Sequence, residues 1–162
     1  MVFTNWTRNY VIYIGASAAA VWDALTSEDM TAKFWGHSNV STWEPGEPWK
    51  HVRTDGSDIS DVVGRVVESE RPGRLAITFS GPDETAAPEP LVTFTIEEYQ
   101  DIVKLSIVHE YIPTAEDAEA AALGWSAVAS NLKSLLETGK VLPQAPWDMH
   151  AEVRDRPLGA RD

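Results

Sequence analysis

The sequence contains no cysteine. Disulfide scaffolds, thiolate zinc sites, iron–sulfur clusters and cysteine nucleophiles are therefore excluded together. It also has no run approaching the roughly 20 apolar residues that a membrane span requires. The segment Arg8–Ala18 is better explained as a strand entering a capped helix than as a secretory signal. We therefore expect a cytoplasmic protein that does not bind membranes.

Positive charge is scarce as well. The chain has 13 Lys and Arg against 25 Asp and Glu, which gives a formal net charge of −12. Such a surface repels phosphate backbones, and no basic patch interrupts it. The sequence therefore predicts no nucleic-acid partner.

Complete catalytic and cofactor motifs are also missing. The four histidines lack the spacing of a metal site, and no phosphate loop or dinucleotide fingerprint is present, so we expect no metal and no cofactor. The segment Gly124–Val128 lacks the second glycine of a GxSxG nucleophile elbow and falls within a helical pattern. No residue is assigned a catalytic role on this basis.

What the sequence does contain is the pattern of one α+β domain of 162 residues. A first strand at 8–14 leads to a helix capped by Ser17 and then to a second short helix capped by Ser27. Strands with period-two alternation follow, separated by turns such as Asp55-Gly56. We expect these strands at 39–43, 49–53, 61–70, 75–79, 92–96 and 103–111. A proline-rich acidic loop at 82–90 is interpreted as a solvated flap, and the alternative is that it gates the pocket.

A long helix is predicted from Thr114 to Thr138. Thr114 with Asp117 resembles a capping box, apolar residues recur at three- and four-residue steps, and Gly139 is a good stop signal. At 1.5 Å per residue the helix is about 36 Å long, enough to cross a whole sheet. An antiparallel sheet must curl around such a helix to bury its apolar face. We therefore expect one domain over 1–140 and a loosely packed extension over 141–162.

Several segments resemble a known family. They are Ser17–Thr26, Phe34-Trp35-Gly36, Gly124–Val128 and Asn131–Glu137, together with the Asp55-Gly56 hairpin and the strand Val62–Val66. These are similar to homologues of the activator of the ninety-kilodalton heat-shock chaperone's ATPase, within the helix-grip superfamily. That superfamily includes START domains, the birch-pollen allergen family and polyketide cyclases. The resemblance covers roughly 8–140 and implies a helix-grip fold with a ligand-sized hydrophobic cavity. In that fold, Gly124 is expected to let the long helix approach the sheet.

Alternation along the strands selects the candidate pocket residues. If Trp49 faces the cavity then so does His51, and the same argument places His109 and Tyr111 together. Aromatic and apolar side chains from other elements complete the predicted wall, with Trp35 near its mouth. The full predicted ligand-binding set is Trp35, Trp49, His51, Phe79, Phe94, His109, Tyr111, Trp125 and Val128.

Three functions remain open from sequence alone. The first is binding of a small apolar or aromatic molecule without catalysis. The second is a polyketide cyclase-like or dehydratase-like enzyme that uses His51 and His109 as proton donors or acceptors, with Tyr111 as a hydrogen-bond donor. The third is a protein-interaction role, with a chaperone, another protein or a second copy of the chain as partner.

Overall fold

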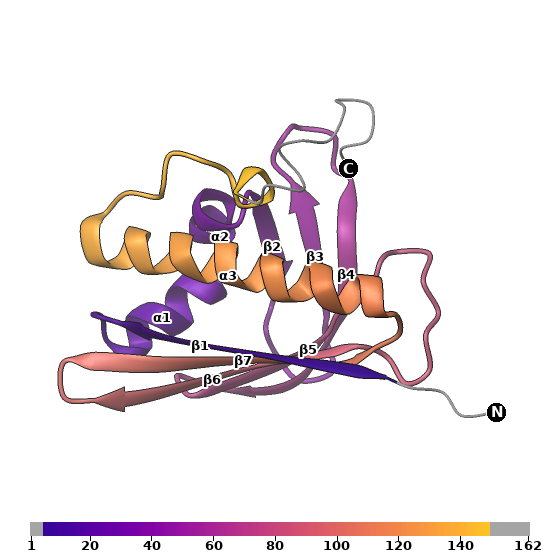
Figure 1. Cartoon of the computed structure of the whole chain (residues 1–162), viewed down its shortest axis with the longest axis horizontal. Coiled ribbons are helices and arrows are strands. Elements are labelled where there is room, and N and C mark those ends of the chain that lie inside the picture. The colour runs from indigo at the N-terminus through magenta and orange to yellow at the C-terminus, as the bar shows by residue number, and fades with distance from the viewer. Residues whose placement is uncertain (1–4, 150–162) are drawn as a thin grey trace.

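The computed structural model describes residues 5–149, which form a curled antiparallel sheet around one long helix (Figure 1). The seven strands have the spatial order β1-β7-β6-β5-β4-β3-β2. The α+β helix-grip architecture predicted from the sequence is confirmed. The strands are β1 (Trp6–Ile14), β2 (His37–Ser41), β3 (Pro48–Arg53), β4 (Ser60–Glu70), β5 (Arg74–Thr78), β6 (Leu91–Tyr99) and β7 (Ile102–Ile112). The helices are α1 (Ala18–Leu25), α2 (Glu28–Phe34), α3 (Ala115–Thr138) and the short 3-10 turn η1 (Pro146–Asp148).

All three predicted helix N-caps are confirmed. The hydroxyl of Ser17 accepts a hydrogen bond from the backbone N–H of Ala20, and that of Ser27 accepts one from Met30. Thr114 caps α3 by accepting from the backbone N–H of Asp117 at 3.0 Å. Such caps satisfy backbone donors that the first turn of a helix leaves unpaired. They explain why the chain changes from strand to helix at these points.

The curl of the sheet creates the space that α3 occupies. Strands β1, β7 and β6 run beneath α3, whereas β2, β3 and β4 rise beside it (Figure 1). The inner face of the lower strands is apolar, and Phe94 on β6 lies opposite Ile107 on β7. The helix therefore has one apolar surface below it and a second wall to one side.

The second half of α3 is firmly attached to its neighbours. Leu132 and Leu135 are buried in the core, and the Asn131 side-chain amide donates to the Phe34 carbonyl oxygen at 3.2 Å. Lys133 Nζ donates to the Tyr13 carbonyl oxygen at 2.7 Å. These contacts connect α3 with α2 and β1.

The chain after Gly139 packs against the same half of α3. The backbone N–H of Leu142 donates to Asn131 Oδ1 at 2.9 Å, and Pro146 is buried. Trp147 lies so close to Gly36 that a methyl group placed there would be 2.2 Å from the indole ring. Residues 141–149 of the predicted loose extension thus make specific contacts, and the remainder lies outside the described residues. None of the helices in the described part is long and apolar enough to cross a membrane.

Candidate functional site

A cavity of about 340 Å³ lies between the first half of α3 and the sheet. Strand β4 and the segment after β5 form one wall, and the end of β7 forms another. Aromatic and aliphatic side chains form much of the lining, and several polar and acidic side chains complete it. The lining comprises Trp35, Asp61, Val62, Phe79, Ser80, Gly81, Glu84, Pro90, His109, Ile112, Pro113, Asp117, Ala120, Ala121, Gly124, Trp125 and Val128.

Small residues on α3 leave this space unfilled. Ala120, Ala121 and Gly124 line the cavity, where larger side chains would enter it. A methyl group placed on Gly124 would meet no heavy atom within 4 Å outside its own stretch of helix. The expectation that Gly124 permits a close helix–sheet approach is therefore wrong. Its effect is to keep room free beneath the helix.

Trp125 is the central side chain of the aromatic wall. Its ring centroid lies 5.2 Å from that of Trp35 and 5.8 Å from those of Phe79 and Phe94. Tilted and edge-on arrangements at these separations are favourable for aromatic pairs. The indole N–H donates to His109 Nδ1 at 3.1 Å, so the polar atom of Trp125 is also satisfied. The ring is thus held from several sides.

Five of the nine predicted ligand-binding residues line the cavity, namely Trp35, Phe79, His109, Trp125 and Val128. They come from the end of α2, the segment after β5, β7 and α3. Their convergence on one cavity agrees with the geometry expected from strand and helix periodicity. That they bind a ligand stays a prediction.

Three other predicted residues lie behind the wall. Trp49 is fully buried, and its indole N–H donates to the Thr78 carbonyl oxygen at 2.7 Å. Phe94 is buried against Trp125, and His51 packs against the edge of Trp35. These side chains support the lining residues from outside the cavity.

Tyr111 points away from the cavity, and the orientation predicted for it is wrong. Its φ of 59° lies in the left-handed region, which interrupts the alternation of β7 after His109. Tyr111 is 40% exposed as a result, and Ile112 turns inward to line the cavity. Strict period-two reasoning fails here because it assumes extended backbone at every residue.

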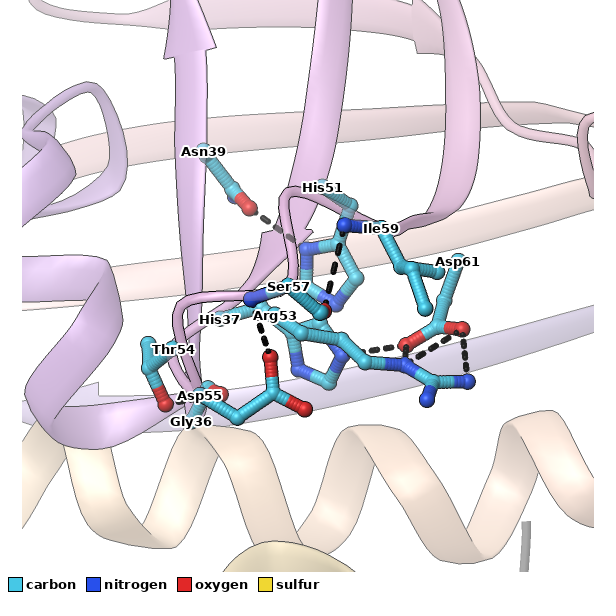
Figure 2. Close-up of polar contacts among 10 residues, drawn as sticks. All are labelled: Gly36, His37, Asn39, His51, Arg53, Thr54, Asp55, Ser57, Ile59 and Asp61. Carbon is cyan, nitrogen blue, oxygen red and sulfur yellow. Dashed lines mark hydrogen bonds and ion pairs between the residues drawn. The ribbon is translucent and has the colours of Figure 1, made fainter.

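A polar cluster beside the cavity was missed by sequence reasoning (Figure 2). His37 stacks on His51 with ring centroids 4.0 Å apart, and its Nε2 lies 2.8 Å from Asp61 Oδ2. Arg53 donates to both oxygens of Asp61, with two of its bonds at 2.8 Å. His51 Nδ1 lies 2.5 Å from Asn39 Oδ1. Of these residues only Asp61 reaches the cavity lining.

Burial keeps both predicted histidines uncharged at neutral pH. It lowers the pKa of His51 to about 3, with the neighbouring His37 adding to the effect. Burial also lowers the pKa of His109 to about 4, against a small opposing influence of Asp117. The Arg53 hydrogen bonds hold the pKa of Asp61 at about 2, so Asp61 is ionised. His51 and His109 do not share the cavity, because only His109 lines it.

The donor set gives no support for a metal centre. Within residues 5–149, no group of three His, Asp or Glu side chains is arranged to hold a metal ion. The cavity carries scattered carboxylates instead, from Asp61, Glu84 and Asp117. Its chemistry is that of an apolar pocket with a few polar groups.

A curled sheet gripping a C-terminal helix over an apolar cavity defines a helix-grip domain. The sequence model of the family described as "Activator of Hsp90 ATPase homolog 1-like protein" matches residues 15–137. The chain belongs to this family, as the sequence resemblance suggested. No curated protein sequence shows significant similarity to it.

Solved structures agree with this assignment of the fold. The Aha1 dimer of Colwellia psychrerythraea superposes with a TM-score of 0.71 at 21% identity, covering 83% of this chain and 98% of that one. CalU16 of Micromonospora echinospora superposes with a TM-score of 0.68 at 18% identity, covering 85% of this chain and 77% of that one. PFC0360w, an HSP90 activator from Plasmodium falciparum, superposes with a TM-score of 0.67 at 15% identity, covering 80% of this chain and 95% of that one. At these identities the likeness establishes the fold alone.

Proposed function

We propose that this protein binds a small apolar or aromatic molecule in the cavity between α3 and the sheet. The observation that carries the proposal is the cavity itself, about 340 Å³ in volume and walled by Trp35, Phe79, Trp125 and Val128. Ligand sites are typically concave, mostly apolar and about 300–1,000 Å³ in volume. This cavity lies at the lower end of that range, so its ligand is small.

The composition of α3 supports the proposal. Glycine inside a helix is less favourable than alanine by roughly 1 kcal/mol. A methyl group at Gly124 would meet no neighbour, so packing does not require glycine there. Retention of space for a ligand explains an otherwise unfavourable residue.

The histidine geometry favours binding over proton-transfer catalysis. The enzyme hypothesis needs two imidazoles at one cavity, and His51 is shielded from it by its place behind Trp35. Tyr111, the expected third polar group, is exposed on the outside. His109 with a pKa of about 4 is a weak base at neutral pH.

A protein-interaction role is the second candidate. The outer face of β1 exposes Val11 and Tyr13, which provide an apolar contact of modest size. Two of the structural neighbours are an Aha1 dimer and an HSP90 activator. A second copy of the chain or a chaperone would be the corresponding partner.

Fluorescence titration with N-phenyl-1-naphthylamine, an uncharged apolar probe, tests the ligand proposal. We expect saturable one-to-one binding to the native protein. Gly124→Leu should weaken binding at least about tenfold, because the new side chain enters the cavity. Gly124→Ala is the matched control, and it should weaken binding less than Gly124→Leu because a single methyl group occupies less of the cavity.

Two results would contradict ligand binding in this cavity. One is no saturable binding to the folded native protein. The other is equal binding to the wild type and to a folded Gly124→Leu variant. If sedimentation also showed a stable dimer that Tyr13→Glu disrupts, the protein-interaction role would replace it.

A further inference from the structure

The proton position on His109 is fixed by its neighbour. An indole nitrogen can only donate a hydrogen bond, so His109 Nδ1, 3.1 Å from Trp125 Nε1, must accept. Burial holds the pKa of this imidazole at about 4, so the ring is neutral at pH 7. The single ring proton therefore lies on Nε2.

That Nε2–H group has no protein acceptor within residues 5–149, although His109 is only 7% exposed. In the same part of the chain, the only side-chain nitrogen or oxygen that is both fully buried and unpaired is His37 Nδ1. His109 Nε2 therefore retains some access, and the cavity that His109 lines provides it. A donor left unpaired in an apolar wall is unfavourable, so an acceptor on the ligand would be selected there.

The charges around the cavity restrict that acceptor further. Asp61, Glu84 and Asp117 line the cavity, and no Lys or Arg does. Asp61 is paired with Arg53, whereas Glu84 and Asp117 have no ion-pair partner within the described part of the chain. A carboxylate ligand would be repelled by these groups, and the chain's overall charge of −12 acts in the same direction.

We propose that His109 donates a hydrogen bond from Nε2 to the ligand, and that the cavity selects uncharged aromatic molecules with a carbonyl oxygen. This inference rests on the proposed ligand-binding function and specifies the ligand class. His109 acts as a fixed donor, because its Nδ1 is occupied by Trp125 and its Nε2 already carries the proton. Trp125 is then a positioning residue, since its indole sets the tautomer.

Displacement of N-phenyl-1-naphthylamine by three naphthalenes of similar shape tests this proposal. They are 2-acetonaphthone, which has a carbonyl oxygen, 2-isopropenylnaphthalene, which has a methylene in its place, and the anion 2-naphthoate. We expect wild-type protein to bind the ketone about tenfold more tightly than the hydrocarbon, as one net hydrogen bond allows. The anion should bind more weakly than the ketone. His109→Phe, which keeps an aromatic ring, should abolish the preference for the ketone.

Equal binding of ketone and hydrocarbon by the wild type would overturn the proposal, as would naphthoate binding as tightly as the ketone. Probe binding in those cases would leave the proposed function intact, whereas absence of all binding would remove both. Histidine ring nitrogen NMR on the wild type needs no variant to fold. It should report the Nε2–H tautomer for His109 and a shift of that signal on adding the ketone. An Nδ1–H tautomer, or a signal unchanged by the ketone at saturation, would refute the assignment.

Discussion

The two halves of α3 lie over the same sheet, but the second half is tightly packed and the first half leaves a cavity. In the second half, Leu132 and Leu135 are buried in the core, and Asn131 is hydrogen-bonded to Phe34 of α2 and to Leu142 after the helix. In the first half, Ala120, Ala121 and Gly124 leave a cavity. Backbone architecture alone therefore does not create the pocket. Side-chain size along one helix decides which half is packed and which half is open.

Trp125 lies where the open half of α3 meets the packed half, and its removal should have the largest effect on stability. Trp125→Ala would delete the ring that contacts Trp35, Phe79 and Phe94. We expect the free energy of unfolding to fall by about 3 to 5 kcal/mol, as for other large-to-small core changes. Urea denaturation would measure it. A loss below about 1 kcal/mol would mean that the aromatic wall contributes little to stability.

Acidification tests the burial of two histidines. His109 on β7 lines the cavity, whereas His51 on β3 is buried in a packed part of the protein. Their folded pKa values, about 4 and about 3, lie below the ordinary value of 6.5. Their stabilising contributions are therefore complete above pH 6.5 and decline as the pH falls toward the folded pKa values. At pH 5 each histidine should cost about 2 kcal/mol relative to pH 7.

The Asp61 carboxylate beside His51 does not contribute to the pH dependence between pH 5 and pH 7. Asp117 faces His109, and His37 and Asp61 face His51. Asp61, with a folded pKa of about 2, loses its contribution only below its ordinary value of 3.8. Urea denaturation at pH 7 and pH 5 measures the change in the free energy of unfolding. His109→Gln should reduce this change by the roughly 2 kcal/mol that His109 contributes. Equal stability at the two pH values would show that the histidines are not buried as described.

Replacing an alanine by leucine in each half of α3 should change stability less than the variants above, but by different amounts in the two halves. Ala129 is fully buried in the packed half, so Ala129→Leu should cost about 1 to 3 kcal/mol through overpacking. Ala121→Leu places its side chain in the cavity and should cost less than about 1 kcal/mol. Thermal and urea unfolding of the pair would check this. Equal costs would mean that the two halves do not differ in packing.

Local sequence signals predicted α3 closely. Thr114, Asp117 and Gly139 mark its ends, and the observed helix begins one residue after the predicted Thr114 start. Capping is a short-range interaction, so the residues that set it are adjacent in sequence. Alternation likewise placed Phe94 and His109 on the inner face. It failed at Tyr111 because one backbone angle departed from the extended region.

The polar cluster could not be predicted in the same way. His37 on β2 lies opposite Arg53 on β3, and β3 in turn pairs with β4, which carries Asp61. The contact of His37 with Asp61 depends on the register of two strand pairings rather than on local pattern. Sequence periodicity identified the apolar wall, whereas the charges around it required the assembled sheet.

A crystal structure of the protein with bound N-phenyl-1-naphthylamine would test the central claim most directly. The account predicts that the probe lies beneath the first half of α3, against Trp35, Phe79 and Trp125, with Gly124 above it. Density for the probe in the packed half of α3 or on the outer face of β1, with this cavity empty, would contradict the account.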